Sequence, residues 1–118
     1  MAEKRNSNRR EFTYYMPILD VASGAIIGHL TDISEHGFRI DTKYRIPVGN
    51  VLNLRLNLGS ELTKKGAIFF QAQSRWSQVD PMEPTLYNVG FEVTKINPED
   101  DLVYQAMVER YSKPSRRF

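Results

Sequence analysis

The segment from Val51 to Leu58 constrains the fold more than any other part of this 118-residue chain. Leucine occupies every second position of the segment, and the residues between the leucines are polar. The leucines are Leu52, Leu54, Leu56 and Leu58. Successive side chains of a β-strand point to opposite faces, so this alternation predicts a half-buried strand. We therefore expect the leucine side of the segment to lie in the core.

Five further segments contain the aromatic, β-branched and other apolar residues that are typical of strands. They are Phe12 to Val21, Ala25 to about Ser34, Phe38 to Asp41, about Ala67 to Val79, and Leu86 to Thr94. Gly24 lies between the first two segments and can supply the positive φ of a tight hairpin connection. Six strands at hairpin spacing, with no helix between them, predict a mainly β fold, either an antiparallel barrel or a sandwich.

A single helix is expected near the C-terminal end, over about residues 98–112. Asn97 can cap it, Pro98 suits its first position, and three acidic residues follow beside the positive end of the helix dipole. The acidic residues are Glu99, Asp100 and Asp101. The apolar face expected from helical spacing consists of Val103, Ala106, Met107 and Tyr111, and Pro114 ends the run. We expect this helix to cover part of the barrel.

The composition is that of a globular domain, with 41% apolar and 25% charged residues. A chain of this length favours one domain, which we assign to residues 12–112. Because the chain has no cysteine, disulfides, thiolate metal sites and cysteine nucleophiles are excluded. Apolar runs such as Ala67–Phe70 are far too short for a membrane span, and the N-terminus lacks the apolar stretch of a signal peptide. We therefore expect a cytoplasmic protein.

Basic residues gather at the two ends of the chain. Residues 1–10 hold four basic side chains and one acidic one, and residues 110–118 hold four basic and no acidic side chains. The remaining residues, 11–109, then hold eight basic and thirteen acidic side chains, a net charge of −5. A general nucleic-acid binder usually spreads its basic residues over a folded face. The distribution instead favours anion capture by a flexible basic arm, residues 1–11, and leaves residues 113–118 as a basic tail.

Asp32, Ser34, His29 and His36 lie close together in sequence and raise the question of a catalytic triad or a metal site. In a strand, Asp32 and Ser34 would share one face at a separation of about 6.6 to 6.8 Å, whereas His29 would point to the other face. A Ser–His pair needs contact within about 3 Å and a third group that orients the base. The sequence also lacks a Gly-rich phosphate loop, a zinc-protease motif and a G-x-S-x-G elbow. We therefore expect neither an enzyme nor a metal site.

Two short motifs remain. R-x-x-x-R runs from Arg5 to Arg9, and D-x-S-x-x-G runs from Asp32 through Ser34 to Gly37. In this order and context they resemble the PilZ family, and the resemblance extends over almost the whole chain, from the basic arm to the closing helix. Between these ends it includes G-H-L-T-D-I-S-E-H-G at Gly28–Gly37, Trp76 after Arg75, and G-F-E-V at Gly90–Val93. The resemblance implies a six-stranded antiparallel PilZ-type β-barrel that binds cyclic di-GMP, a bacterial second messenger.

The resemblance places arginines of the arm on the ligand. Cyclic di-GMP has two guanines and two phosphates and is dianionic, so its receptor must neutralise charge and read a purine edge. The planar fork of arginine matches the O6 and N7 acceptors of guanine and can also pair with a phosphate. Arg5 and Arg9 are the expected ligand-binding residues of the arm, and Arg10 could substitute for Arg9. No cofactor is implied beyond the ligand itself.

The second motif is expected to supply the barrel side of the same site. Asp32 can accept hydrogen bonds from guanine N1 and N2, or hold an arginine fork in place. Ser34 can donate to a phosphate or to a base edge. Gly37 would offer a backbone N–H and the absence of a side chain where the ligand comes close. Trp76 is expected in the core rather than in contact with the ligand.

Several functions remain open for these residues. The first is a cyclic di-GMP receptor that changes the conformation of its arm and relays the signal to a protein partner. The second is a PilZ-like adaptor that binds a protein partner and ignores nucleotides, and the third is weak RNA or DNA binding, which the acidic body disfavours. A structural alternative also stands, in which Asp32 and Ser34 are turn residues and Arg5 and Arg9 belong to a solvated tail.

Overall fold

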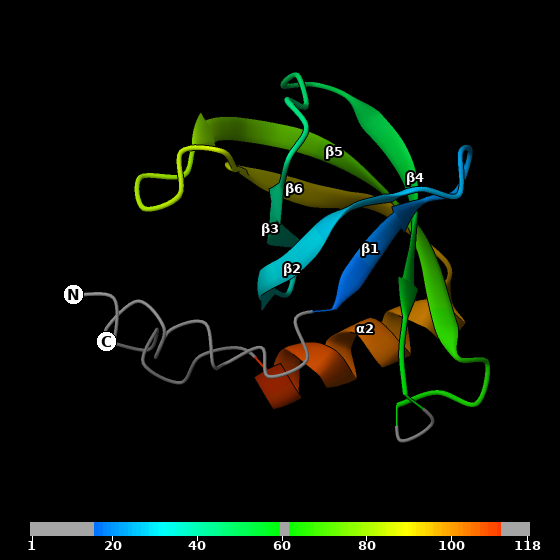
Figure 1. Ribbon diagram of the computed structural model, residues 1–118. Helices are drawn as coiled ribbons and strands as arrows, with labels where there is room; N and C mark the ends of the chain where they lie inside the picture. The colour runs from blue at the N-terminus through cyan, green and yellow to red at the C-terminus, as the bar shows by residue number, and fades with distance from the viewer. Residues whose placement is uncertain (1–15, 60–61, 112–118) are drawn as a thin grey trace.

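Six antiparallel strands close into a barrel and a helix packs across one end of it, in residues 16–59 and 62–111, the part of the chain that the computed structural model describes (Figure 1). The elements are β1 (Pro17–Asp20), β2 (Ile26–Ser34), β3 (Gly37–Thr42), β4 (Val51–Asn57), β5 (Ala67–Val79), β6 (Tyr87–Ile96) and α2 (Pro98–Tyr111). Around the barrel the strands follow the order β1-β2-β3-β6-β5-β4, and β1 closes it by pairing with β4. The predicted six-stranded antiparallel barrel with a C-terminal helix is confirmed.

Three expectations concern residues outside the described part. They are the flexible arm at residues 1–11, the beginning of the strand expected from Phe12, and the basic tail at residues 113–118. The division of the chain into arm, domain and tail therefore stays a prediction.

The leucine stripe of β4 faces the barrel interior, as predicted. Leu54 and Leu56 are at most 1% exposed, and Leu52 and Leu58 are partly buried at the two ends of the stripe. The polar residues between them face solvent. β4 pairs with β5 without a register shift and with β1 on its other side.

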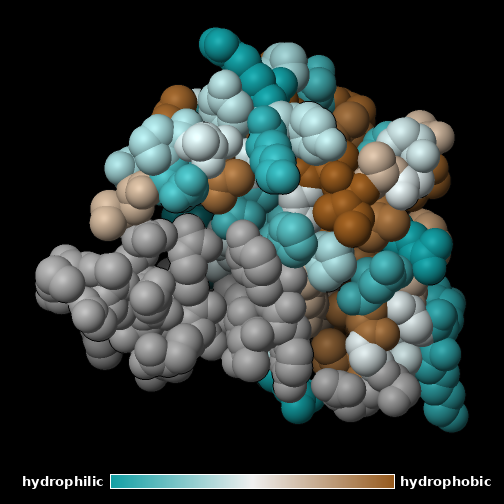
Figure 2. Space-filling model, in the orientation of Figure 1, coloured by the Kyte–Doolittle hydropathy of each residue, from teal (hydrophilic) through white to brown (hydrophobic). Residues whose placement is uncertain are grey.

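The surface of the domain is mixed in hydropathy. Figure 2 shows hydrophilic side chains over much of the visible face, with smaller hydrophobic patches among them.

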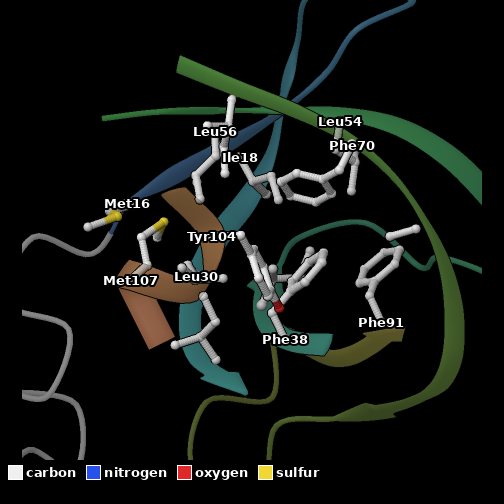
Figure 3. Packing of buried hydrophobic residues seen from close by; sticks show 14 of the residues in the cluster. Met16, Ile18, Leu30, Phe38, Leu54, Leu56, Phe70, Phe91, Tyr104 and Met107 are labelled. Atoms are coloured by element: carbon white, nitrogen blue, oxygen red, sulfur yellow. The ribbon is translucent and has the colours of Figure 1, made fainter. Parts of the chain in front are cut away.

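Aromatic rings from three strands and the helix meet inside the barrel (Figure 3). Phe38 of β3 stacks on Phe91 of β6, with ring centroids 5.2 Å apart and an interplanar angle of 10°. Phe70 of β5 meets Phe38 edge-on at 5.6 Å and Tyr104 of α2 at 6.0 Å. Stacked and edge-to-face contacts of this kind stabilise a core beyond the area that they bury. The helix therefore contributes to the core and does more than cover it.

The buried face of α2 differs from the predicted one. It consists of Asp100, Tyr104, Met107 and Tyr111. Of the residues predicted for this face, Ala106 is exposed and Val103 is only partly buried. The prediction missed Tyr104 because a phenol can be fully buried when its hydroxyl finds a hydrogen-bond acceptor. It missed Asp100 because carboxylates are almost never buried without a partner.

Asp100 fastens the first turn of α2 to the barrel. Its side chain is 1% exposed, with Oδ1 at 2.5 Å from Lys65 Nζ, and Oδ2 accepts a hydrogen bond from the Phe69 N–H at 3.1 Å. The predicted cap is also present, because Asn97 Oδ1 accepts from the Asp100 N–H at 2.8 Å. Burial raises the pKa of Asp100, but the hydrogen bonds from Lys65, the Phe69 N–H and Asn97 outweigh it, and the pKa lies below its ordinary value. Asp100 is therefore a buried, ionised anchor for the helix.

Candidate functional site

The D-x-S-x-x-G motif spans the end of β2, a tight turn and the start of β3. Across this hairpin Asp32 pairs with Arg39, and Ser34 pairs with Gly37. Ile33 lies between the two polar residues and is 1% exposed, in the core. Since alternate side chains of a strand point the same way, Asp32 and Ser34 share the outer face of β2, as their spacing predicted.

A cleft of about 370 Å³ opens beside the motif on the outside of the barrel. One wall comes from the β2–β3 hairpin and the other from β5 and β6. The lining residues are Asp32, Ile33, Ser34, Gly37, Phe38, Arg39, Arg75, Trp76, Gly90 and Phe91. The structure thus brings together the three barrel residues that the sequence assigned to a site. The other three assigned residues, Arg5, Arg9 and Arg10, lie outside the described residues.

The two polar side chains of the motif are held by their own hairpin. Asp32 Oδ1 accepts a hydrogen bond from the Ile33 N–H at 2.9 Å. Ser34 Oγ donates to the carbonyl oxygen of Gly37 at 3.2 Å and is solvent-exposed. A carboxylate has about four lone-pair sites and a hydroxyl can rotate, so both groups can make further hydrogen bonds from these positions.

Gly37 is required by the packing of β3 against β6. A Cβ added at this position would lie 2.2 Å from the carbonyl oxygen of Phe91. No side chain fits that distance, so any substitution would push the start of β3 away from β6. This is a structural reason for glycine, separate from the close ligand approach expected from the sequence, which stays a prediction.

Trp76 lies in the cleft, and the prediction of a core tryptophan is wrong. It is 40% exposed, and its indole packs directly on Gly90, where an added Cβ would come within 2.2 Å of Trp76 Nε1. The cause is a register shift between Ser74 and Trp76 where β5 pairs with β6. Regular alternation would place Trp76 on the buried side with Ser74, but a bulge turns the following side chain to the other face.

Two arginines line the same cleft. Arg39 Nε donates to Thr31 Oγ1 at 3.3 Å. Arg75 Nη1 lies 3.4 Å from Glu92 Oε1, and both of these side chains are at least half exposed. Among the described residues of the lining, Asp32 is the single carboxylate, so this part of the cleft carries more positive than negative charge. It combines guanidinium groups, a carboxylate, a hydroxyl and an indole, which suits a ligand that has both anionic groups and flat rings.

Comparison with known proteins establishes the family. A sequence model described as "PilZ domain" matches residues 3–111, which include both motifs and all the described elements. The chain belongs to the PilZ family. A search of curated protein sequences finds no match.

Solved structures with the same fold include proteins of three bacteria. The Bacillus subtilis inhibitor of motility (MotI/DgrA) gives a TM-score of 0.65 at 17% identity, over 80% of this chain and 46% of that one. The PilZ domain of Escherichia coli YcgR, solved with c-di-GMP, gives 0.56 at 17% identity, over 87% and 85% of the two chains. MrkH of K. pneumonia in its apo state gives 0.58 at 16% identity, over 80% and 45%. The present chain therefore spans less than half the length of MotI and MrkH, and the likeness shows the fold.

In this PilZ domain the motif turn also forms hydrogen bonds with two side chains of α2. The Tyr104 hydroxyl lies 2.9 Å from the carbonyl oxygen of Ser34 and 2.8 Å from that of Gly37, and it donates to this pair. Gln105 Nε2 donates to the carbonyl oxygen of Glu35 at 3.2 Å. Burial, with a smaller effect of Asp101, raises the pKa of Tyr104 above its ordinary value, so the phenol keeps its proton and stays a donor. Sequence analysis missed this contact because about seventy residues separate the two partners.

Neither a metal cluster nor a membrane span is found in the described part of this PilZ domain. No three of its His, Asp and Glu side chains are grouped as metal ligands would be. His36 is exposed in the motif turn, with Nε2 at 3.6 Å from Glu35 Oε1. None of the helices there has the length and apolar character needed to cross a bilayer.

Proposed function

We propose that this PilZ domain binds cyclic di-GMP in the cleft beside the D-x-S-x-x-G motif. The observation that carries the proposal is the composition of the cleft, in which Asp32 and Ser34 lie in one lining with Trp76, Arg39 and Arg75. Family membership supports it, as does the PilZ domain of YcgR, a structure of the same fold that was solved with c-di-GMP.

The indole of Trp76 is the stacking platform for a guanine. A base stacked on an aromatic ring gains about 1–3 kcal/mol. The indole packs on Gly90, where a side chain would collide with it, so one face of the ring lies against β6. Asp32 would then accept from the N1 and N2 donors of a guanine, and Ser34 would donate to a phosphate or base edge.

The arginines neutralise the phosphates and read the Hoogsteen edge of guanine. Arg39 and Arg75 do so from the barrel, and Arg5 and Arg9 from the arm, with Arg10 as the alternative to Arg9. Each guanidinium can pair bidentately with a phosphate or with guanine O6 and N7. Ordering of the arm by the ligand is the conformational change that relays the signal to a protein partner. A binding rather than an enzymatic role, and a cytoplasmic location, stay predictions of this proposal.

Titration calorimetry with cyclic di-GMP tests the proposal. Trp76→Ala should weaken binding by about 5- to 150-fold, which corresponds to the stacking energy. The matched control is Phe69→Ala, because Phe69 is an aromatic residue of the same strand, 45% exposed, and absent from the cleft lining. Arg75→Ala and Arg9→Ala should also weaken binding, whereas Arg55→Ala, an exposed arginine of β4, should not.

Absence of heat with the unmodified protein would overturn the proposal and favour the nucleotide-independent adaptor. Equal losses in the cleft variants and in their matched controls would show that the ligand binds elsewhere. Cyclic di-AMP, which has the same two phosphates but lacks the guanine edge, serves as the specificity control.

A further inference from the structure

A second groove lies beside the motif turn, on the outer side of α2. Its volume is about 370 Å³, and its lining residues are Glu35, Leu102, Gln105, Ala106, Val108 and Glu109. We propose that this turn–helix groove binds a segment of a protein partner that carries basic and apolar side chains. The proposal rests on the proposed function for its link to cyclic di-GMP, but the groove itself does not.

The groove is lined by apolar and by acidic side chains. Leu102 is 75% exposed, more than any other large apolar side chain in the described part of the chain. Ala106, in the next turn of α2, is also exposed. Exposed apolar surface at such a position marks a site of interaction when it is bordered by polar groups. The partner must therefore bring at least one apolar side chain to this point.

The charged side chains that line the groove are of one sign among the described residues. Glu35 of the turn and Glu109 of α2 line it, and none of the described lining residues is basic. Arg110, the one basic residue of α2, lies over the ring of Tyr111 at 6.0 Å from its centroid. Carboxylates beside exposed apolar side chains attract lysine and arginine and repel a nucleic-acid backbone. Charge complementarity thus selects a basic protein segment.

The groove shares its wall with the ligand site. Glu35 belongs to the turn between Ser34 and Gly37, and its carbonyl oxygen accepts from Gln105 Nε2 at 3.2 Å. The Tyr104 hydroxyl bonds the carbonyls at both ends of the same turn. A ligand that contacts one side of this turn and a partner that contacts the other side therefore both act on the hydrogen-bonded contact between the turn and α2. Partner affinity should change when cyclic di-GMP binds, and by reciprocity partner binding should change ligand affinity equally.

A synthetic peptide of alternating leucine and lysine pairs, labelled with fluorescein, is a suitable probe. Its binding to the full chain is followed by fluorescence anisotropy in the absence of nucleotide. Leu102→Asp and Glu109→Lys should each weaken binding by about tenfold or more, as loss of a central interface contact does. The matched controls are Met82→Asp and Glu83→Lys, which place the same changes on the exposed β5–β6 loop, away from α2 (Figure 1). The controls should leave the peptide affinity unchanged.

The outcomes separate this inference from the proposed function. Absence of peptide binding, or an equal loss of affinity in the groove variants and the control variants, would overturn the proposal for the groove, even if cyclic di-GMP binds. A tenfold or greater gain in peptide affinity on removal of residues 112–118 would show that the basic tail of the chain occupies the groove. That result would also overturn the proposal of a protein partner at this position. Failure of cyclic di-GMP to bind would instead overturn the proposed function and leave the nucleotide-free peptide result intact. If both bind, cyclic di-GMP should change the peptide affinity, and Tyr104→Phe should reduce that change.

Discussion

Removal of the Asp100 carboxylate should loosen the helix from the barrel. In Asp100→Ala the Phe69 N–H loses its acceptor at 3.1 Å, and Lys65 loses its ion-pair partner. Because the side chain of Lys65 is 41% exposed, it regains water, and we assign no energy to it. A hydrogen bond to a charged acceptor is worth about 1.5–3 kcal/mol, so we expect a loss of about 2–3 kcal/mol in the free energy of unfolding.

That loss is large for a domain of this size. Stabilities of about 5–15 kcal/mol are typical, and each kcal/mol lowers the melting temperature of a domain near 100 residues by about 4 °C or more. Asp100→Ala should therefore melt at least about 8–12 °C below the unmodified protein. Urea unfolding followed by far-UV circular dichroism gives the free energy, and thermal scans give the melting temperature.

The matched control is Glu99→Gln. Glu99 precedes Asp100 in the same helical turn and faces the same dipole, but its side chain is exposed. Its removal should cost little beyond the dipole interaction, about 0.3–1 kcal/mol, because its attraction to the exposed Lys65 is the smallest of the effects on that amine. If Asp100→Ala lost no more stability than Glu99→Gln, the buried hydrogen bonds would not anchor the helix, and the reasoning would be refuted.

Three further predictions concern the same structure. Because the pKa of Asp100 lies below its ordinary value of 3.8, its stabilising effect is complete above that value and is lost as the pH falls through the folded-state pKa. The stability gap between the unmodified protein and Asp100→Asn should therefore be constant near neutrality and shrink below about pH 4, and a gap that persists unchanged to about pH 2 would contradict this. Gly90→Ala should force the Trp76 indole off β6, since the new Cβ would meet it at 2.2 Å, and should shift the tryptophan emission, whereas unaltered emission would refute the contact. Tyr104→Phe should cost about 1–2 kcal/mol and speed amide exchange in the motif turn, because the turn carbonyls lose a buried donor. The exposed Tyr44→Phe should do neither, and equal behaviour of the two variants would exclude the proposed tether.

Elements set by neighbouring residues were predictable from the sequence. The strand expected from about Ala67 to Val79 is β5 as observed, and α2 begins at Pro98 after the Asn97 cap, as predicted. Hydrophobic alternation and helix capping depend on residues a few positions apart, so the sequence alone contains the information. The shared outer face of Asp32 and Ser34 followed for the same reason.

Features set by a distant partner were not predictable in this way. Trp76 reaches the cleft because of a bulge, and a bulge is defined by the pairing of β5 with β6 rather than by the residues of β5 alone. Gly90 was the available signal, since the missing side chain opposite a tryptophan leaves room for the indole. The buried face of α2 likewise depends on which groups of the barrel can receive Asp100 and Tyr104.

The charge in the cleft supports the proposed role of the arm in ligand binding. The described lining contains two guanidinium groups, of Arg39 and Arg75, and one carboxylate, of Asp32. Arg75 also forms an ion pair with Glu92, with Nη1 at 3.4 Å from Oε1. The barrel alone therefore supplies at most one net positive charge to a dianionic ligand, and a second must come from elsewhere. Both ends of the chain carry an excess of basic side chains, with four against one acidic in residues 1–10 and four against none in residues 110–118. Of the two, the arm is the proposed source because it carries the R-x-x-x-R motif. If the arm takes part as proposed, affinity for cyclic di-GMP should fall as the salt concentration rises, because dissolved ions screen the attraction between its guanidinium groups and the phosphates.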